Sequence, residues 1–216
     1  MKKFFSIMCC LLMVLSGCGS NLENVDNQQI EPIDLSGYIT TEEYSCIVDD
    51  SFRYYILFVT NTSDVTVKID ANILAHDENN QQIASYSEVI HAVAPNQTSC
   101  IWTTFDEWDS ITSFDYNLQV QEQSSVSAIY DKVVIEYKLT DDKIIASATN
   151  QSEEVAKFVW LNVVFLKDGK MVNFRELSLM NDDCELLPST TLSAEGICYS
   201  ENGFDDVRIA LNGRIE

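Results

Sequence analysis

The residues best suited to metal or redox chemistry in this chain are its 7 cysteines and 2 histidines. Three cysteines lie within the first 18 residues, and four lie further along: Cys46, Cys100, Cys184 and Cys198. No two of these four have C-x-x-C spacing, and neither His76 nor His91 is near a cysteine in the sequence. This spacing argues against a structural zinc site, and we expect no metal and no cofactor.

The four distal cysteines could form disulfides if the chain is exported to an oxidising compartment. Cys184 and Cys198 lie about equally far on either side of Thr191 in a predicted β-hairpin, which favours their pairing. Cys46 would then pair with Cys100. The alternative is that all four are free thiols.

The N-terminus has the features of a bacterial export signal. Two lysines precede an apolar run from Phe4 to Leu15, which is long enough for a signal-peptide core and too short for a permanent membrane span. The run ends in Leu15-Ser16-Gly17-Cys18, which resembles the lipobox of bacterial lipoproteins. We therefore expect residues 1–17 to be a lipoprotein signal peptide. Cys18 would carry the lipid that anchors the protein to the extracytoplasmic face of the cell membrane. The alternative is an ordinary signal peptide.

The composition limits the partners that the protein can have. The chain has 34 acidic and 13 basic residues, and removal of Lys2 and Lys3 with the signal would take the net charge from −21 to −23. A charge this negative argues against binding nucleic acid, and it favours a soluble surface or capture of a cation or basic partner. Residues 18–37 are polar and lack apolar periodicity, which predicts the lipidated cysteine and a flexible tether.

Two kinds of acidic segment could bind a ligand. In Thr104-Phe105-Asp106-Glu107-Trp108-Asp109, Trp108 could stack on a sugar ring while the carboxylates bind its hydroxyl groups, or it could simply pack beneath its own domain. The acidic clusters Asn181-Asp182-Asp183 and Glu201 to Asp206 supply the oxygen ligands that calcium prefers. Neither contains an EF-hand loop, so at most weak calcium binding is expected.

Catalytic motifs are absent from the sequence. There is no Gly-x-Ser-x-Gly elbow, no phosphate-binding loop and no His-Glu-x-x-His motif, and we expect no enzymatic activity. A hydrolase that uses only carboxylates remains a weak alternative, because two acids can converge in space without any sequence signature.

The chain repeats itself with an offset of about 90 residues. Each half begins with a predicted β-hairpin, one over Glu43 to Thr60 and one over Lys132 to Thr149. An Asn-x-Ser corner follows, at Asn61 and at Asn150, and then a long alternating strand, at 65–75 and 155–165. We interpret these asparagines, and that of the Asn96 sequon, as turn residues.

Short alternating strands with turns every 8 to 12 residues predict an all-β fold of antiparallel β-sandwiches. The repeat further predicts two tandem immunoglobulin-like domains, over residues 38–124 and 125–216.

The order of these elements resembles the FxLYD-type immunoglobulin-like domains of Gram-positive lipoproteins. The strongest local match is the segment Val163 to Lys170, which ends in an apolar–Asp–Gly–Lys turn. The first half departs from this pattern at Ala75-His76-Asp77 and at Asn79. The resemblance implies a binding or architectural module and carries no catalytic residues.

Phe158 and Trp160 are the candidate partner-binding residues of the second half. They occupy the outward face of the 155–165 strand, where the equivalent strand of the first half has Lys68 and Asp70. Exposed aromatic residues mark contact surfaces, and the alternative is that the first domain covers them. The sequence therefore suggests a membrane-anchored, non-catalytic interaction module for a protein or glycan partner. The alternative is a structural or accessory subunit of a cell-envelope complex.

Overall fold

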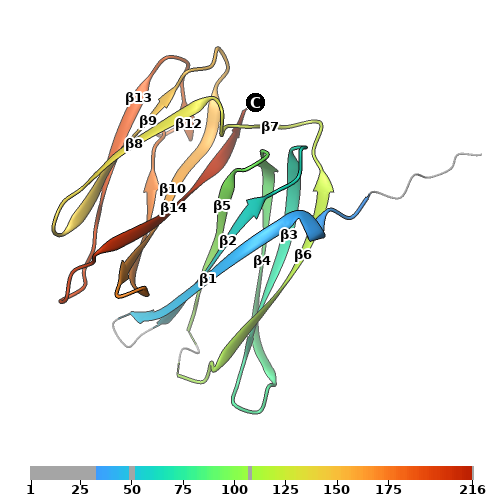
Figure 1. Ribbon diagram of the computed structural model, residues 1–216, viewed down its shortest axis with the longest axis vertical. Coiled ribbons are helices and arrows are strands. Elements are labelled where there is room, and N and C mark those ends of the chain that lie inside the picture. The colour runs from blue at the N-terminus through green and yellow to red at the C-terminus, as the bar shows by residue number, and fades with distance from the viewer. Residues whose placement is uncertain (1–32, 49–51, 107–108, 216) are drawn as a thin grey trace, which may run out of the picture. The chain divides into compact units, whose positions relative to one another are not determined.

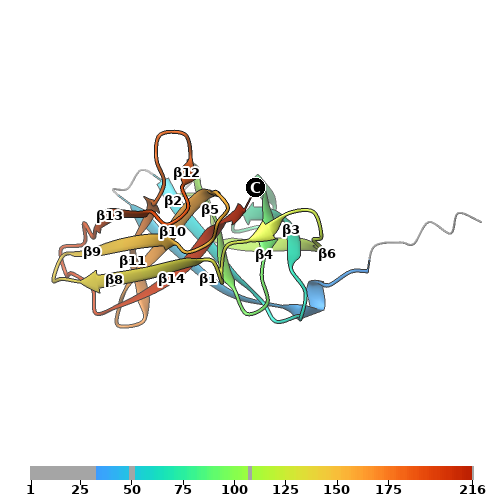
Figure 2. The ribbon, with the colours of Figure 1, turned by 90° about the horizontal axis from the view of Figure 1, so that it is seen from above.

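The protein folds almost entirely into antiparallel β-strands (Figures 1 and 2). The computed structural model describes residues 33–48, 52–106 and 109–215. Its non-β element is a short 3-10 turn, Ser36–Tyr38. No helix in this part of the chain is long and apolar enough to cross a membrane. The all-β class predicted from the sequence is confirmed.

The N-terminal half, residues 33–122, consists of two three-stranded sheets. One has the order β1 (Ile39–Val48), β2 (Phe52–Asn61) and β5 (Thr98–Phe105). The other has the order β4 (Gln82–Val93), β3 (Val67–His76) and β6 (Ser113–Glu122). A core of buried apolar side chains lies between these sheets.

The C-terminal half, residues 127–215, repeats this arrangement. One sheet has the order β13 (Thr191–Ile197), β9 (Lys143–Asn150) and β8 (Val133–Leu139), which lie side by side in Figures 1 and 2. The other has the order β11 (Lys170–Ser178), β10 (Ala156–Lys167), β14 (Asp206–Ile215) and β7 (Ser127–Ala128). The short β12 (Glu185–Leu186) also pairs with β10. This half has a second core of its own. Residues 32–216 nevertheless form one compact unit, so the division into two domains stays a prediction.

The two Asn-x-Ser corners are equivalent. Asn61 and Asn150 are each fully buried, and each side-chain amide donates to two backbone carbonyls. Each Oδ1 accepts from the backbone and the hydroxyl group of the serine two residues on, Ser63 or Ser152. Both therefore close a turn, as the sequence predicts. Asn96 also lies in a turn, with a left-handed φ of 63°.

Strands β2 and β10 are buried on both faces. In β2, Tyr55 and Leu57 point into the N-terminal core, while Ile56 and Phe58 point the other way. In β10, Val163 and Phe165 fill the C-terminal core, and the intervening Val164 joins Ile56 and Phe58 in a third apolar cluster. This cluster lies between the halves, which explains why both strands are nearly continuous apolar runs.

The four described cysteines are free, so neither predicted disulfide is present. Cys46 and Cys100 lie opposite Tyr54 and Phe58 on the two strands that flank β2. Two strand spacings and four residues separate them by about 16 Å, whereas a disulfide needs Cα atoms within about 7 Å.

The predicted hairpin around Thr191 is also wrong. The chain crosses from one sheet to the other within this segment, because β12 pairs with β10 and β13 pairs with β9. Cys184 and Cys198 are therefore not held opposite each other on two paired strands.

Candidate functional site

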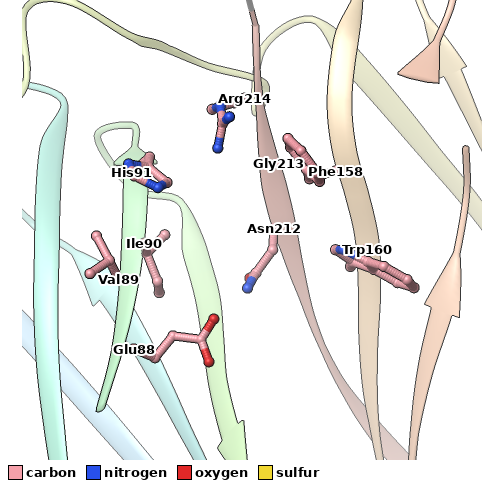
Figure 3. A pocket seen from close by; sticks show the side chains of 9 residues that line it. All are labelled: Glu88, Val89, Ile90, His91, Phe158, Trp160, Asn212, Gly213 and Arg214. Atoms are coloured by element: carbon pink, nitrogen blue, oxygen red, sulfur yellow. The ribbon is translucent and has the colours of Figure 1, made fainter. Parts of the chain in front are cut away.

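A groove runs between the two halves, where β4 faces β10 and β14 (Figure 3). Its volume is about 270 Å³. β4 contributes four lining residues, β10 contributes both aromatic residues singled out from the sequence, and β14 contributes three more. They are Glu88, Val89, Ile90, His91, Phe158, Trp160, Asn212, Gly213 and Arg214.

Phe158 enters this groove through an irregularity in β10. The register between β10 and β14 shifts between Lys157 and Trp160, and Phe158 has a left-handed φ of 56°. A bulky side chain in this conformation is an outlier, because its Cβ approaches the following carbonyl oxygen. Its backbone N–H donates to the carbonyl of Cys184 at 3.1 Å.

Gly213 allows this irregularity on the facing strand. It has a φ of 147°, and an added Cβ would lie 2.5 Å from Cδ1 of Ile129. The same atom would lie 3.2 Å from the carbonyl oxygens of Lys157 and Phe158. Only glycine therefore fits beside the shifted segment.

Phe158 remains 39% exposed. The Arg214 guanidinium carbon lies 4.6 Å from the ring centroid, a distance typical of a cation–π contact. Trp160, two residues along β10, is partly buried and lines the same groove. The two side chains thus form an aromatic wall.

Two carboxylates lie beside this wall on strands from different halves. The Tyr86 hydroxyl donates to Glu88 on β4, and the Trp102 indole N–H donates to Oε1 of Glu176 on β11 at 2.8 Å. Burial raises the pKa of Glu176, and the negative charge of Glu88 raises it further, while the bond from Trp102 opposes the shift. Burial and the bond to Glu88 likewise raise the pKa of Tyr86.

Asn162 lies next to Glu176 and has no hydrogen-bond partner. It is directly opposite Glu176 in the β10–β11 register and is fully buried. Neither its Oδ1 nor its Nδ2 makes a hydrogen bond. Unpaired buried polar groups are rare, because such a group has lost its bonds with water without replacement.

Polar contacts hold β14 against β5 and the turn before it, next to the groove. Gln97 Nε2 and Ser99 Oγ donate to the carbonyl of Leu211, at 2.9 and 3.2 Å. The side chain of Asn212 bonds to the backbone of Cys100. These contacts join β14, which lines the groove, to the N-terminal half.

Comparison with known proteins identifies no family. No family model matches the sequence, and no curated protein matches it. Among solved structures, the chain is similar to red sea bream transglutaminase, at 10% sequence identity and a TM-score of 0.25. The match covers 82% of this chain and 29% of that protein.

The face of β10 that carries Phe158 and Trp160 is only partly covered by the first half. Further along the strand, Asn162, Val164 and Leu166 are buried, the last two in the cluster between the halves. Phe158 and Trp160, in contrast, border the groove. The first half therefore covers most of this face and leaves its end open.

Trp108 and Cys18 lie outside the described residues. The described residues contain no group of three or more His, Cys, Asp or Glu side chains suited to a metal ion.

The acidic turns have local partners instead. Asn181 Oδ1 accepts from the backbone of Asp183 and Glu185, and Asp206 pairs with Arg208 at 2.6 Å. Weak calcium binding stays a prediction.

Sequence reasoning missed Glu88, Glu176 and Arg214. They lie on β4, β11 and β14, and nothing local in the sequence shows that these strands meet. The available signal was the doubly apolar character of β2 and β10, which requires a second covering layer.

Proposed function

We propose that the protein is a lipid-anchored lipoprotein on the extracytoplasmic face of a bacterial membrane, where it acts as a non-catalytic interaction module. The segment Leu15-Ser16-Gly17-Cys18 supports the anchor. The strand order of each half supports a binding module. The segment from Val163 to Lys170, which resembles FxLYD-type domains, supports it too. The groove beside Phe158 and Trp160 is the proposed partner site.

The observation that carries this proposal is the backbone of Phe158. A left-handed conformation costs about 1–2 kcal/mol for a residue with a Cβ. Phe158 is 39% exposed, and its side chain borders a groove instead of filling a core. Strained backbone conformations of this kind cluster at active sites and ligand-binding sites.

An accessory or structural role is the second candidate, and a specific observation favours it. The apolar cluster that includes Ile56, Phe58 and Val164 joins the halves. Much of the face of β10 that carries Phe158 and Trp160 is therefore buried between the halves. Such internal packing is expected of a spacer or of a subunit of an envelope complex.

The experiment that separates these candidates uses residues 32–216, which form one compact unit. This fragment and its Phe158→Ser/Trp160→Ser variant are screened against arrays of bacterial and host-surface glycans and of peptides, and the Tm of each is recorded. A variant that keeps its Tm within a few degrees and loses a defined ligand supports the interaction module. No ligand for either protein, with a much lower Tm for the variant, supports the accessory role.

A further inference from the structure

We propose that the groove binds the cationic side chain of a lysine or arginine from a basic peptide, between the Glu88 carboxylate and the ring of Trp160. This inference rests on the proposed function, since it names the partner chemistry of the same groove. It derives from charges that the fold leaves uncompensated.

Glu88 is placed to receive a cation. Its side chain extends from β4 toward β14, across the groove from Trp160 (Figure 3). In the described residues, neither Glu88 nor Glu176 forms an ion pair with a lysine, arginine or histidine, whereas Asp70 and Glu195 pair with Lys68 and Lys143. A ligand cation would supply the missing counter-ion.

The second carboxylate strengthens this attraction. The charge of Glu88 raises the pKa of Glu176, so the two acids repel each other across the boundary between the halves. A cation beside Glu88 interacts favourably with both. Because the groove excludes part of the solvent, this attraction is stronger than between exposed groups.

The aromatic wall completes the site. Ammonium and guanidinium groups are attracted to aromatic faces, and Arg214 already occupies one such face, that of Phe158. Arg214 and His91 lie at the end of the groove opposite Glu88 (Figure 3). We therefore expect a ligand cation to bind at the other end of the groove, between Glu88 and Trp160.

Asn162 is a second polar side chain without a partner in this part of the protein, although it does not line the groove. It lies two residues from Trp160 on the same face of β10, opposite Glu176, and its amide is buried without a hydrogen bond. The net charge of −21 would also attract a basic peptide over longer distances.

The test is an NMR titration of residues 32–216 with the pentapeptide Gly-Gly-Lys-Gly-Gly, acetylated at its N-terminus and amidated at its C-terminus. We expect saturable shifts of the Trp160 indole N–H and of the Val89 and Asn212 amides, weakening as salt is added. The matched peptide with Nε-acetyl-lysine should bind at least tenfold more weakly. Glu88→Gln, which keeps the size of the side chain, should weaken binding at least fivefold. Glu136→Gln, at an exposed acid on β8, should have no effect.

The inference is overturned if the two peptides bind equally, if neither binds, or if Glu88→Gln binds as well as the wild type. The spectrum of each variant shows whether it is folded. If the aromatic double variant loses an array ligand that carries no cation, the interaction module stands and this inference fails. If the arrays yield no ligand and the lysine peptide does not bind, both fail.

Discussion

The side-chain amide of Asn212 mimics a strand partner for Cys100, because it bonds to both backbone groups of that residue. The Cys100 N–H donates to Oδ1 at 2.8 Å, and Nδ2 donates to the Cys100 carbonyl at 2.7 Å. Cys100 lies on β5, an edge strand of its sheet. The C-terminal half thus caps backbone groups of this strand that would otherwise be open to pairing with another chain.

Replacing Asn212 with alanine should therefore destabilise the protein and expose this edge. We expect a loss of about 1–3 kcal/mol in the free energy of unfolding, because two partly buried backbone groups lose their partners. Urea unfolding measures this loss, and light scattering measures association. Asn117→Ala, at an exposed position on β6, is the control and should change neither. Equal stability of the two variants would contradict a capping role for Asn212.

Phe158→Gly should separate binding from stability. Glycine adopts a left-handed φ without strain, which recovers about 1 kcal/mol and offsets most of the loss of a half-buried ring. The net change in the free energy of unfolding should stay below about 1 kcal/mol. Trp160→Gly, at a strand position without a positive φ, should cost clearly more. A large destabilisation by Phe158→Gly would mean that the ring serves packing.

The free thiols should react slowly in the folded protein. Burial raises the pKa of Cys46 to about 11 and holds the pKa of Cys100 well above its usual range. At pH 8 both are protonated, and a thiol is a poor nucleophile compared with its thiolate. In residues 32–216 we expect four alkylated cysteines after denaturation, slow alkylation of Cys46 and Cys100 before it, and no effect of a reducing agent on Tm. A mass increase of 2 or 4 Da on reduction would show that disulfides form after all.

The carboxylate of Glu176 should lower stability at neutral pH. Its pKa is raised in the folded state, so the folded protein binds this proton more tightly than the unfolded chain does. The stabilising contribution of the protonated form is complete below the ordinary pKa, near 4.5, and is lost as pH rises through the folded value. Glu176→Gln should therefore stabilise the protein at pH 7 and have a smaller effect at pH 4.5.

Urea unfolding at the two pH values measures this difference. Glutamine keeps an oxygen acceptor for Trp102, which makes the substitution conservative at that bond. Glu136→Gln serves as the exposed control and should show no such pH dependence. Equal effects of Glu176→Gln at both pH values would contradict a raised pKa.

The parts of the fold that depend on local periodicity could be predicted from the sequence. In the alternating strand β3, Val67, Ile69 and Ile73 lie on the face opposite the outward Lys68 and Asp70, and the structure buries all three completely. The equivalence of the two halves along the chain followed from the repeat. The same alternation in β10 predicts that Lys157, between the outward positions, points inward, but the register shift beside it leaves this lysine half-buried, with its Nζ 3.7 Å from Oε1 of Glu185.

The parts that depend on long-range pairing could not be predicted. Nothing near Cys184 indicates that Glu185 and Leu186 pair with β10 while the next strand joins β9. The same is true of the groove, since Glu88 and Trp160 meet only because β4 and β10 are placed by separate sheets. Alternation along a strand shows which residues share one face of that strand. It does not show which other sheet packs against that face.

The repeated asparagine corners provide a final test of the repeat itself. Asn61 and Asn150 make the same set of hydrogen bonds at equivalent positions. Each donates to two backbone carbonyls and accepts from a serine hydroxyl group. Replacement of either by aspartate removes the amide donor and leaves two carbonyls facing a buried charge. We expect each variant to lose about 2–5 kcal/mol in urea unfolding. Asn96→Asp, at the exposed third sequon, should be nearly neutral, and a large effect there with small effects at the corners would refute their role as buried turn anchors.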